Sequence, residues 1–204
     1  MPEHIIPHRD ANDPAPADRF DHVSMTFHWA TLLLIAAVFA TAWARQSASD
    51  GDSAEALLTL HRSIGGALWI GTLARLIWKQ SKGHSPHLPH TLSRIQRFMA
   101  RSTQYALYIL LLLQPATGFA QSIARGKPFE LLGGMIPAMM ARDKLLVHLA
   151  HDVHETTAWV LLGLIGLHAL AALAHHFILR DGVLRSMLPP SAYHGLRKIF
   201  RGRE

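Results

Sequence analysis

The stretch HDVHETTAWVLLGLIGLHALAALAHHF, residues 151–177, decides how this chain is interpreted. From residue 158 to residue 174 it reads as an ordinary membrane span, except that His168 lies in its middle. His154 stands fourteen positions earlier. Polar residues inside a membrane span are costly and by default are functional candidates. The two histidines are therefore the first candidates for a functional site.

The composition indicates a membrane protein. Half of the 204 residues are hydrophobic, and they form long uninterrupted blocks. The chain has no cysteine, which excludes cysteine-ligated iron–sulfur clusters, covalently attached c-type haem and disulfides. Histidine is abundant, with 15 residues. The net charge of +6 gathers in segments that flank the apolar blocks, so it indicates membrane topology and no nucleic-acid partner.

Four apolar blocks are long enough to cross about 30 Å of hydrocarbon at about 1.5 Å per residue. They cover residues 27–44, 56–78, 98–123 and 145–179. We therefore predict an all-α integral membrane four-helix bundle over residues 27–180, with a flexible N-terminal tail (1–26) and a basic C-terminal tail (181–204). The first block ends in FATAWARQ, which resembles a signal-peptide cleavage site, but the long polar stretch before it favours a retained helix.

The distribution of lysine and arginine predicts the orientation. The segment between the second and third blocks and the segment after the fourth hold most of the basic residues. By the positive-inside rule, both termini and this middle loop face the cytoplasm. The loops at 45–55 and 124–144 then face outward.

This orientation sorts four histidines into two levels. His61 and His154 share the outer level, and His28 and His168 share the inner level, about 21 Å away along the fourth helix. Fourteen residues is just under four helical turns, so His154 and His168 project from nearly the same face. Each pair joins two helices, as a bis-histidine haem requires.

Glycines near these histidines would leave room for a flat macrocycle, although small residues also serve close helix packing. They are Gly65, Gly66, Gly163 and Gly166. Each histidine alone is equally explained by a hydrogen bond to a neighbouring helix, but four histidines matched in two levels favour haem. A histidine-lined metal or proton relay is the remaining alternative.

Other polar residues have weaker assignments. Arg75 at the inner level and Arg62 at the outer level would pair with haem propionates, or else contact lipid headgroups and flank the spans. His175 and His176 would contact a propionate or a quinone carbonyl, or simply lie at the interface. His148 and His151 could form an outer metal site, although interfacial residues are favoured there.

Four segments resemble the prokaryotic cytochrome b561 family, and specifically its bacterial superoxide oxidase branch. They are FHWATLLLIAAVFA, LHRSIGGALWIGTLARLIWK, LLLLQPATGFAQSIARGKPFELLGG and VHETTAWVLLGLIGLHALAALAHHFILRDGVLRSMLP, which together cover nearly all of residues 24–190. The resemblance implies a multi-pass protein of the bacterial inner membrane with two b haems. It carries their axial ligands onto His28, His61, His154 and His168.

The resemblance also implies an activity, the transfer of electrons from superoxide at the periplasmic side to ubiquinone. Outward-facing basic residues would steer the small anion: Arg62, Arg125, Lys127, Arg142 and Lys144. His175, His176 or Asp181 would relay protons to the quinone. The alternatives are a non-catalytic electron-transfer subunit that passes electrons between a partner dehydrogenase or hydrogenase and the quinone pool, and a histidine-lined metal or proton transporter.

Overall fold

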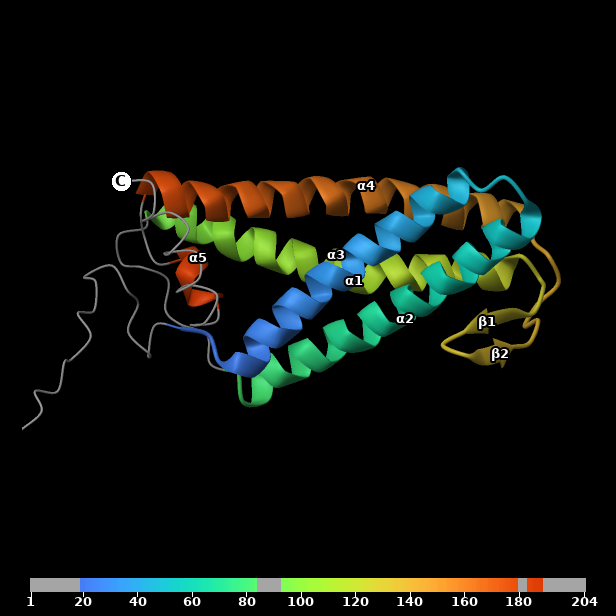
Figure 1. The fold of residues 1–204 in the computed structure, drawn as a ribbon, viewed down its shortest axis with the longest axis horizontal. Coiled ribbons are helices and arrows are strands. Elements are labelled where there is room, and N and C mark those ends of the chain that lie inside the picture. Colours follow the sequence, from blue (N-terminus) through green and yellow to red (C-terminus); the bar gives the residue numbers. More distant parts are fainter. Residues whose placement is uncertain (1–18, 84–92, 180–182, 189–204) are drawn as a thin grey trace, which may run out of the picture.

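The computed structural model describes residues 19–83, 93–179 and 183–188. Within these ranges four long helices run in sequence: α1 (His22–Gln46), α2 (Gly51–Ser81), α3 (Arg94–Ala124) and α4 (Lys144–Ala174). A π-helical turn, η2 (His175–Leu179), continues α4, and a short helix, α5 (Val183–Ser186), follows. Figure 1 shows α1 lying along α2 and α3 lying along α4.

The first three helices begin several residues before their apolar blocks because polar residues cap them. Asp21 accepts a hydrogen bond from Ser24 N at 2.8 Å, and Asp50 accepts one from Ser53 N at 2.7 Å. Ser93 forms a capping box with Gln96 at the start of α3. Each cap satisfies backbone donors that a helix start leaves open. The helix expected from residue 27 therefore starts at His22, whereas residues 1–18 of the predicted tail lie outside the described residues.

The helices meet in one apolar layer. Ile35, Leu68, Leu111 and Leu161 form a buried cluster to which each long helix contributes one side chain. Leu161 lies midway in the chain between His154 and His168. The layer therefore separates the two predicted histidine levels.

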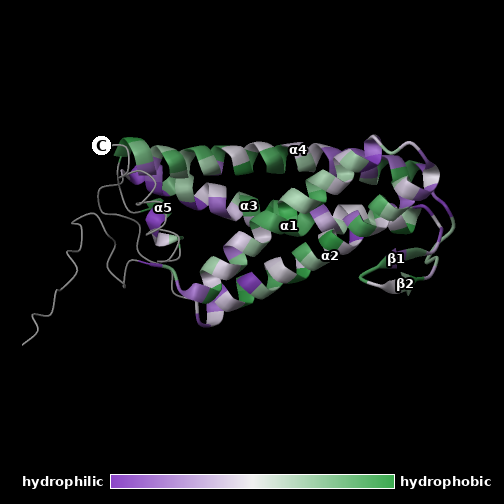
Figure 2. Ribbon diagram, in the orientation of Figure 1, coloured by the Kyte–Doolittle hydropathy of each residue, from purple (hydrophilic) through white to green (hydrophobic). Residues whose placement is uncertain are grey.

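Three helices in the described ranges are long and apolar enough to cross a membrane: α1, α3 and α4 with the start of η2. Much of their apolar surface faces outward, including Leu33 at 71% and Ile109 at 63% exposure. Figure 2 shows hydrophobic residues along the middle of the helices and hydrophilic residues toward both ends of the bundle. This pattern is typical of helices surrounded by lipid. The prediction of a membrane protein is confirmed for these three spans, and α2 does not meet the same criterion.

The described structure is mostly helical, as predicted, and adds one short β-hairpin that the sequence analysis did not foresee. β1 (Phe129–Leu131) pairs antiparallel with β2 (Gly134–Ile136), and their turn holds Leu132 and Gly133 at φ values of 52° and 78°. Positive φ at both central residues is typical of a tight hairpin turn. The hairpin lies at the end of the bundle opposite α5 (Figure 1) and packs on α2, where Leu132 N donates to Ser63 Oγ at 3.0 Å.

Candidate functional site

The structure brings the four histidines together as two pairs. His61 on α2 faces His154 on α4 with ring centroids 6.3 Å apart. His28 on α1 faces His168 on α4 with centroids 6.4 Å apart. The ring planes are inclined by 77° and 67°, respectively. These are the pairs expected from the spacing, and they lie on opposite sides of the apolar layer.

The separations suit a metal held between two imidazoles. An imidazole nitrogen binds a transition metal at about 2.0–2.1 Å, so two rings opposed across one metal have centroids about 6 Å apart. Both pairs match this distance. Within the described residues, no three His, Cys, Asp or Glu side chains gather as a metal cluster. The donor set therefore fits two bis-imidazole sites better than a polynuclear centre.

In the outer pair, hydrogen bonds to backbone carbonyls determine which ring nitrogen carries the proton. His61 Nδ1 lies 3.0 Å from Val38 O, and His154 Nδ1 lies 3.1 Å from Gln114 O. A carbonyl only accepts, so each Nδ1 donates, and a neutral ring then leaves Nε2 as the ligating nitrogen. Such second-shell bonds orient metal-binding histidines and raise their basicity.

Threonine hydroxyl groups also contact the Nδ1 atoms of the outer histidine pair. Thr41 Oγ1 lies 3.3 Å from His61 Nδ1, and Thr117 Oγ1 lies 3.0 Å from His154 Nδ1. The Gln114 amide donates to His154 O at 2.9 Å and also lies 3.4 Å from His154 Nε2. Sequence reasoning missed these residues because their role depends on contacts between helices far apart in the chain.

The inner pair has different neighbours. Arg75 Nη2 lies 3.3 Å from His28 Nδ1, and Trp29 packs edge-on against the His28 ring at 5.5 Å. The indole of Trp29 donates to Met187 O at 3.0 Å, which ties the segment after α5 to this end of the bundle. Arg75 thus lies at the inner site, where the sequence placed it.

The glycines fall into two groups. A Cβ added at Gly65, Gly163 or Gly166 would meet nothing within 4 Å, so these positions leave room beside the histidines for a flat group. Gly66 instead faces the hairpin, where a Cβ would lie 3.3 Å from Leu131 Cδ1. This corrects the expectation that Gly66 lines the site. Gly118, which the sequence did not single out, lies against the His154 ring.

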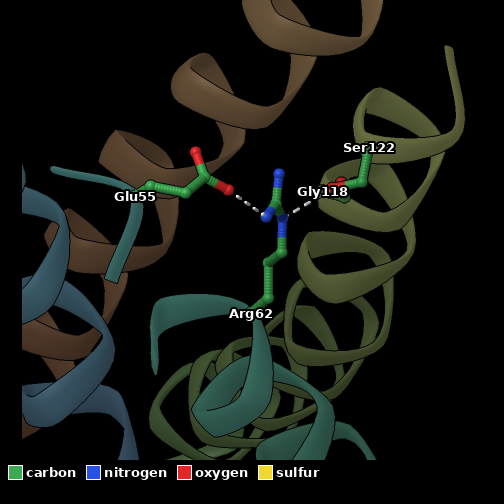
Figure 3. Close-up of polar contacts among 4 residues, drawn as sticks. All are labelled: Glu55, Arg62, Gly118 and Ser122. Carbon is green, nitrogen blue, oxygen red and sulfur yellow. Dashed lines mark hydrogen bonds and ion pairs between the residues drawn. The ribbon is translucent and has the colours of Figure 1, made fainter. Parts of the chain in front are cut away.

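Arg62 is buried at the outer end, with a side-chain exposure of 10%. Figure 3 shows its guanidinium between Glu55 and Ser122: Nη1 pairs with Glu55 Oε1 at 3.1 Å, and Nε donates to Ser122 Oγ at 3.2 Å. Ser122 in turn donates to Gly118 O at 3.0 Å. The guanidinium also stacks over the Phe129 ring of the hairpin at 5.2 Å. Arg62 is thus held by contacts within the protein, and its pairing with a haem propionate or a lipid headgroup stays a prediction.

Some of the basic residues expected to attract a small anion lie near one another at the outer end. Burial and the nearby positive charges of Arg62 and Arg45 lower the pKa of Arg125. The backbone at Gly126 passes close to the backbone at Arg142, and a Cβ on Gly126 would lie 2.5 Å from Arg142 N. Glycine also allows the φ of 64° found at this position. Arg142, Lys127 and Lys144 are exposed. Arg125 therefore has basic neighbours at the outer end, although this end also carries acidic residues, among them Glu55 and Asp143.

The remaining predicted residues lie at the two ends. His175 and His176 fall in η2, and His176 Nδ1 is buried without a hydrogen-bond partner in the described structure. His151 pairs with Glu155 on the next helical turn at 3.5 Å. Neither His151 nor His148 belongs to a metal-binding group within the described ranges. Asp181 lies outside the described residues.

Comparison with known proteins places this chain in a family. The sequence model of prokaryotic cytochrome b561 matches residues 19–190. Cytochrome b561 homolog 2 of Escherichia coli (strain K12) is 33% identical over 178 residues, 86% of this chain and 94% of the relative. Cytochrome b561 homolog 1 of the same strain is 31% identical over 173 residues, 84% of this chain and 98% of the relative. The probable superoxide oxidase CybB of Yersinia pestis is 26% identical over 171 residues, 84% of this chain and 96% of the relative.

Proposed function

This chain belongs to the prokaryotic cytochrome b561 family of membrane electron-transfer proteins, and we propose that it carries electrons from superoxide to ubiquinone through two b haems. The observation that carries the proposal is the presence of two histidine pairs, each spaced for one metal, on opposite sides of an apolar layer. His61 and His154 would hold the outer haem. His28 and His168 would hold the inner haem.

We also propose that α2 is the fourth membrane span, in a bacterial inner membrane. Its outward face is apolar, with Trp69 41%, Ile70 56%, Leu73 38% and Ile77 68% exposed. Its polar groups are turned to partners in the bundle, such as Arg62 to Ser122 and Arg75 to the Tyr108 ring. Buried or paired polar groups are what a membrane helix tolerates. Four spans put both termini on one side of the membrane, and the distribution of Lys and Arg favours the cytoplasmic side.

The net reaction balances in electrons and protons. Two superoxide anions lose one electron each and leave as two dioxygen molecules. One ubiquinone gains the two electrons and takes up two protons. Bound haem supplies the one-electron chemistry. The residues of this chain then have three tasks: to hold two haems in line, to attract the anion and to supply protons.

The outer end performs the attraction. Arg125 has Arg62 and Arg142 as charged neighbours, and Lys127 and Lys144 add exposed positive charge beside acidic residues such as Asp143. A cleft or surface of one charge sign raises the encounter rate of a small ion of opposite sign, in a manner that salt weakens. The name of the Yersinia relative, probable superoxide oxidase, supports the choice of anion.

The inner end would serve the quinone. We place the proton relay at η2, because a buried His176 Nδ1 without a protein partner is a ready donor or acceptor for a quinone carbonyl. π-helical turns are frequent at functional sites. His175 stands beside it in the same turn.

The test is to expose the oxidised, detergent-purified protein to a superoxide-generating system and record its optical spectrum. We expect haem reduction that superoxide dismutase abolishes, followed by reoxidation when ubiquinone is added. Haem that stays oxidised would overturn superoxide as the donor. The chain would then be assigned as a partner-dependent electron carrier, the alternative that the same haem sites allow. A protein that binds no haem would leave the transporter alternative.

Replacing Glu55 with Gln should raise the rate of reaction with superoxide by about two- to threefold at low salt. The carboxylate of Glu55 is 66% exposed and offsets the charge of Arg62, so its removal makes the outer end more positive. Stopped-flow reduction at several ionic strengths would measure this. The matched control is Glu55→Asp, which keeps the charge. A rate that is unchanged or lower at low salt would contradict the steering role.

A further inference from the structure

We propose that the hairpin of β1 and β2 dips into the outer leaflet of the bilayer, so that its turn at Leu132 lies against lipid acyl chains beside α2. The partner of this surface is the lipid itself. The inference rests on the proposed function only in taking α2 as a membrane span. It does not depend on haem, superoxide or quinone.

The contacts between the hairpin and α2 run inward along that helix. Where the hairpin begins, the ring of Phe129 lies under the guanidinium of Arg62 at 5.2 Å. At the turn, Leu131 and Leu132 lie against Gly66, where an added Cβ would be 3.3 Å and 3.5 Å from their Cδ1 atoms. The step from Arg62 to Gly66 is one helical turn, about 6 Å inward at ~1.5 Å per residue. Figure 1 likewise shows the hairpin folded back along the bundle, with its turn toward the middle of the helices.

The turn therefore lies deeper than the outer histidine pair. Gly66 follows His61 by five residues on α2, roughly 7 Å further inward. The ring of His61 already faces a carbonyl within a membrane span, since its Nδ1 lies 3.0 Å from Val38 O on α1. A segment on the outside of the bundle at this depth meets lipid.

The hairpin lies on the lipid-facing side of α2. Ile70 and Leu73 follow Gly66 by four and seven residues, so they project from nearly the same face of the helix. Both are exposed, at 56% and 38%, and Trp69 beside them is 41% exposed. Exposed apolar side chains on a membrane span are covered by lipid. The turn of the hairpin is thus continuous with a strip of α2 that contacts the bilayer.

The chemistry of the turn suits lipid better than water. Leu132 has a φ of 52°, a conformation that Gly, Asn or Asp supplies in most hairpin turns and that a bulky residue rarely adopts. Its side chain is still 51% exposed, and Met135 on the other strand is 68% exposed. The Leu132 N–H donates to Ser63 Oγ at 3.0 Å, so a backbone donor that hydrocarbon would leave unsatisfied has a partner.

Charged residues limit how far the hairpin enters. Lys127 is exposed where the hairpin begins, and Glu130 is exposed in β1, opposite Met135 in the ladder. At about 3.3 Å per strand residue, Leu132 lies roughly 7 Å beyond Glu130. Interfacial elements bury their apolar face by about 5–10 Å, which matches this reach. We therefore place Lys127 and Glu130 among the headgroups and Leu132 among the acyl chains.

The experiment is site-directed spin labelling of the purified holoprotein in phosphatidylcholine bilayers. The chain has no cysteine, so Leu132→Cys, Met135→Cys, Lys127→Cys and Ile70→Cys each provide one labelling site. Each labelled variant is first checked for the haem content of the wild type. Power saturation of the nitroxide signal is then measured with oxygen, which concentrates in hydrocarbon, and with a water-soluble nickel chelate, which hydrocarbon excludes.

The label at position 132 should lose the effect of the nickel chelate and retain that of oxygen. Ile70 is the matched lipid control, one turn inward on the same face of α2, and should behave in the same way. Lys127 is the water control and should respond to the nickel chelate. Met135 should give an oxygen-to-nickel ratio between those of positions 132 and 127, which keeps the inference testable if the Leu132 variant does not fold.

A nickel effect at position 132 as large as that at position 127 would overturn the inference, because the turn would then lie in water. Loss of both effects would also overturn it, since the turn would be covered by protein, such as a second copy of this chain. A lipid signal at Ile70 with a water signal at Leu132 removes the hairpin anchor and leaves α2 as a span. A water signal at Ile70 overturns the span and the anchor together.

Discussion

Replacing His154 with Leu should reduce the bound haem from two per chain to one. The iron of the outer site would keep His61 alone, and Leu has no lone pair to replace the lost ligand. The inner pair lies beyond the apolar layer and should be unaffected. Pyridine haemochrome assay of the purified protein, divided by protein concentration, measures the ratio.

His168→Leu is the mirror variant, because the same helix supplies a ligand to each level. It should also leave one haem, and the double variant should leave none. His151→Leu is the matched control on the same helix: its ring pairs with Glu155 near the outer end, so both haems should remain. If either single variant still binds two haems, the histidine that it replaces is not required to hold a haem.

Replacing Gly118 with Ala should weaken haem binding at the outer site by about ten- to a hundredfold, the usual effect of disturbing the second shell of a metal site. The added Cβ would lie 3.0 Å from His154 Cε1 and 3.3 Å from Nδ1. The ring cannot move away freely, because Gln114 O and Thr117 Oγ1 both hold its Nδ1. Relief of the contact therefore breaks these bonds.

Haem titration of the apoprotein, followed at the Soret band, gives the two affinities for this variant. The control is Gly71→Ala, since a Cβ at Gly71 would meet nothing within 4 Å. It changes the same residue type in a neighbouring helix and should bind both haems as the wild type does. An unchanged haem affinity of the outer site in Gly118→Ala would show that haem binding does not depend on the ring position that His154 has here.

Much of this arrangement could be read from the sequence, because membrane spans and helix periodicity are local properties. His154 and His168 were placed on one face by counting turns, and their partners followed from the orientation of the chain. The early start of α1 at His22 was missed, since it depends on a cap by Asp21 outside the apolar block. The hairpin was missed because Leu132, a residue that rarely adopts positive φ, stands at its turn.

The second shell could not be predicted, for a different reason. Val38 and Gln114 act through backbone carbonyls, which every residue has, so no residue type marks them. The contact of Gly118 with His154 appears only when α3 and α4 are packed. Likewise, the pairing of Arg62 with Glu55 requires the fold of the outer end.

The most direct measurement of the central claim is the haem content of the detergent-purified wild-type protein, together with its low-temperature electron paramagnetic resonance spectrum. Two low-spin ferric haems per chain, each with the signature of bis-histidine ligation, are the predicted result. A protein that binds one haem, or none, would contradict the assignment of the two histidine pairs and with it the path from the outer to the inner face.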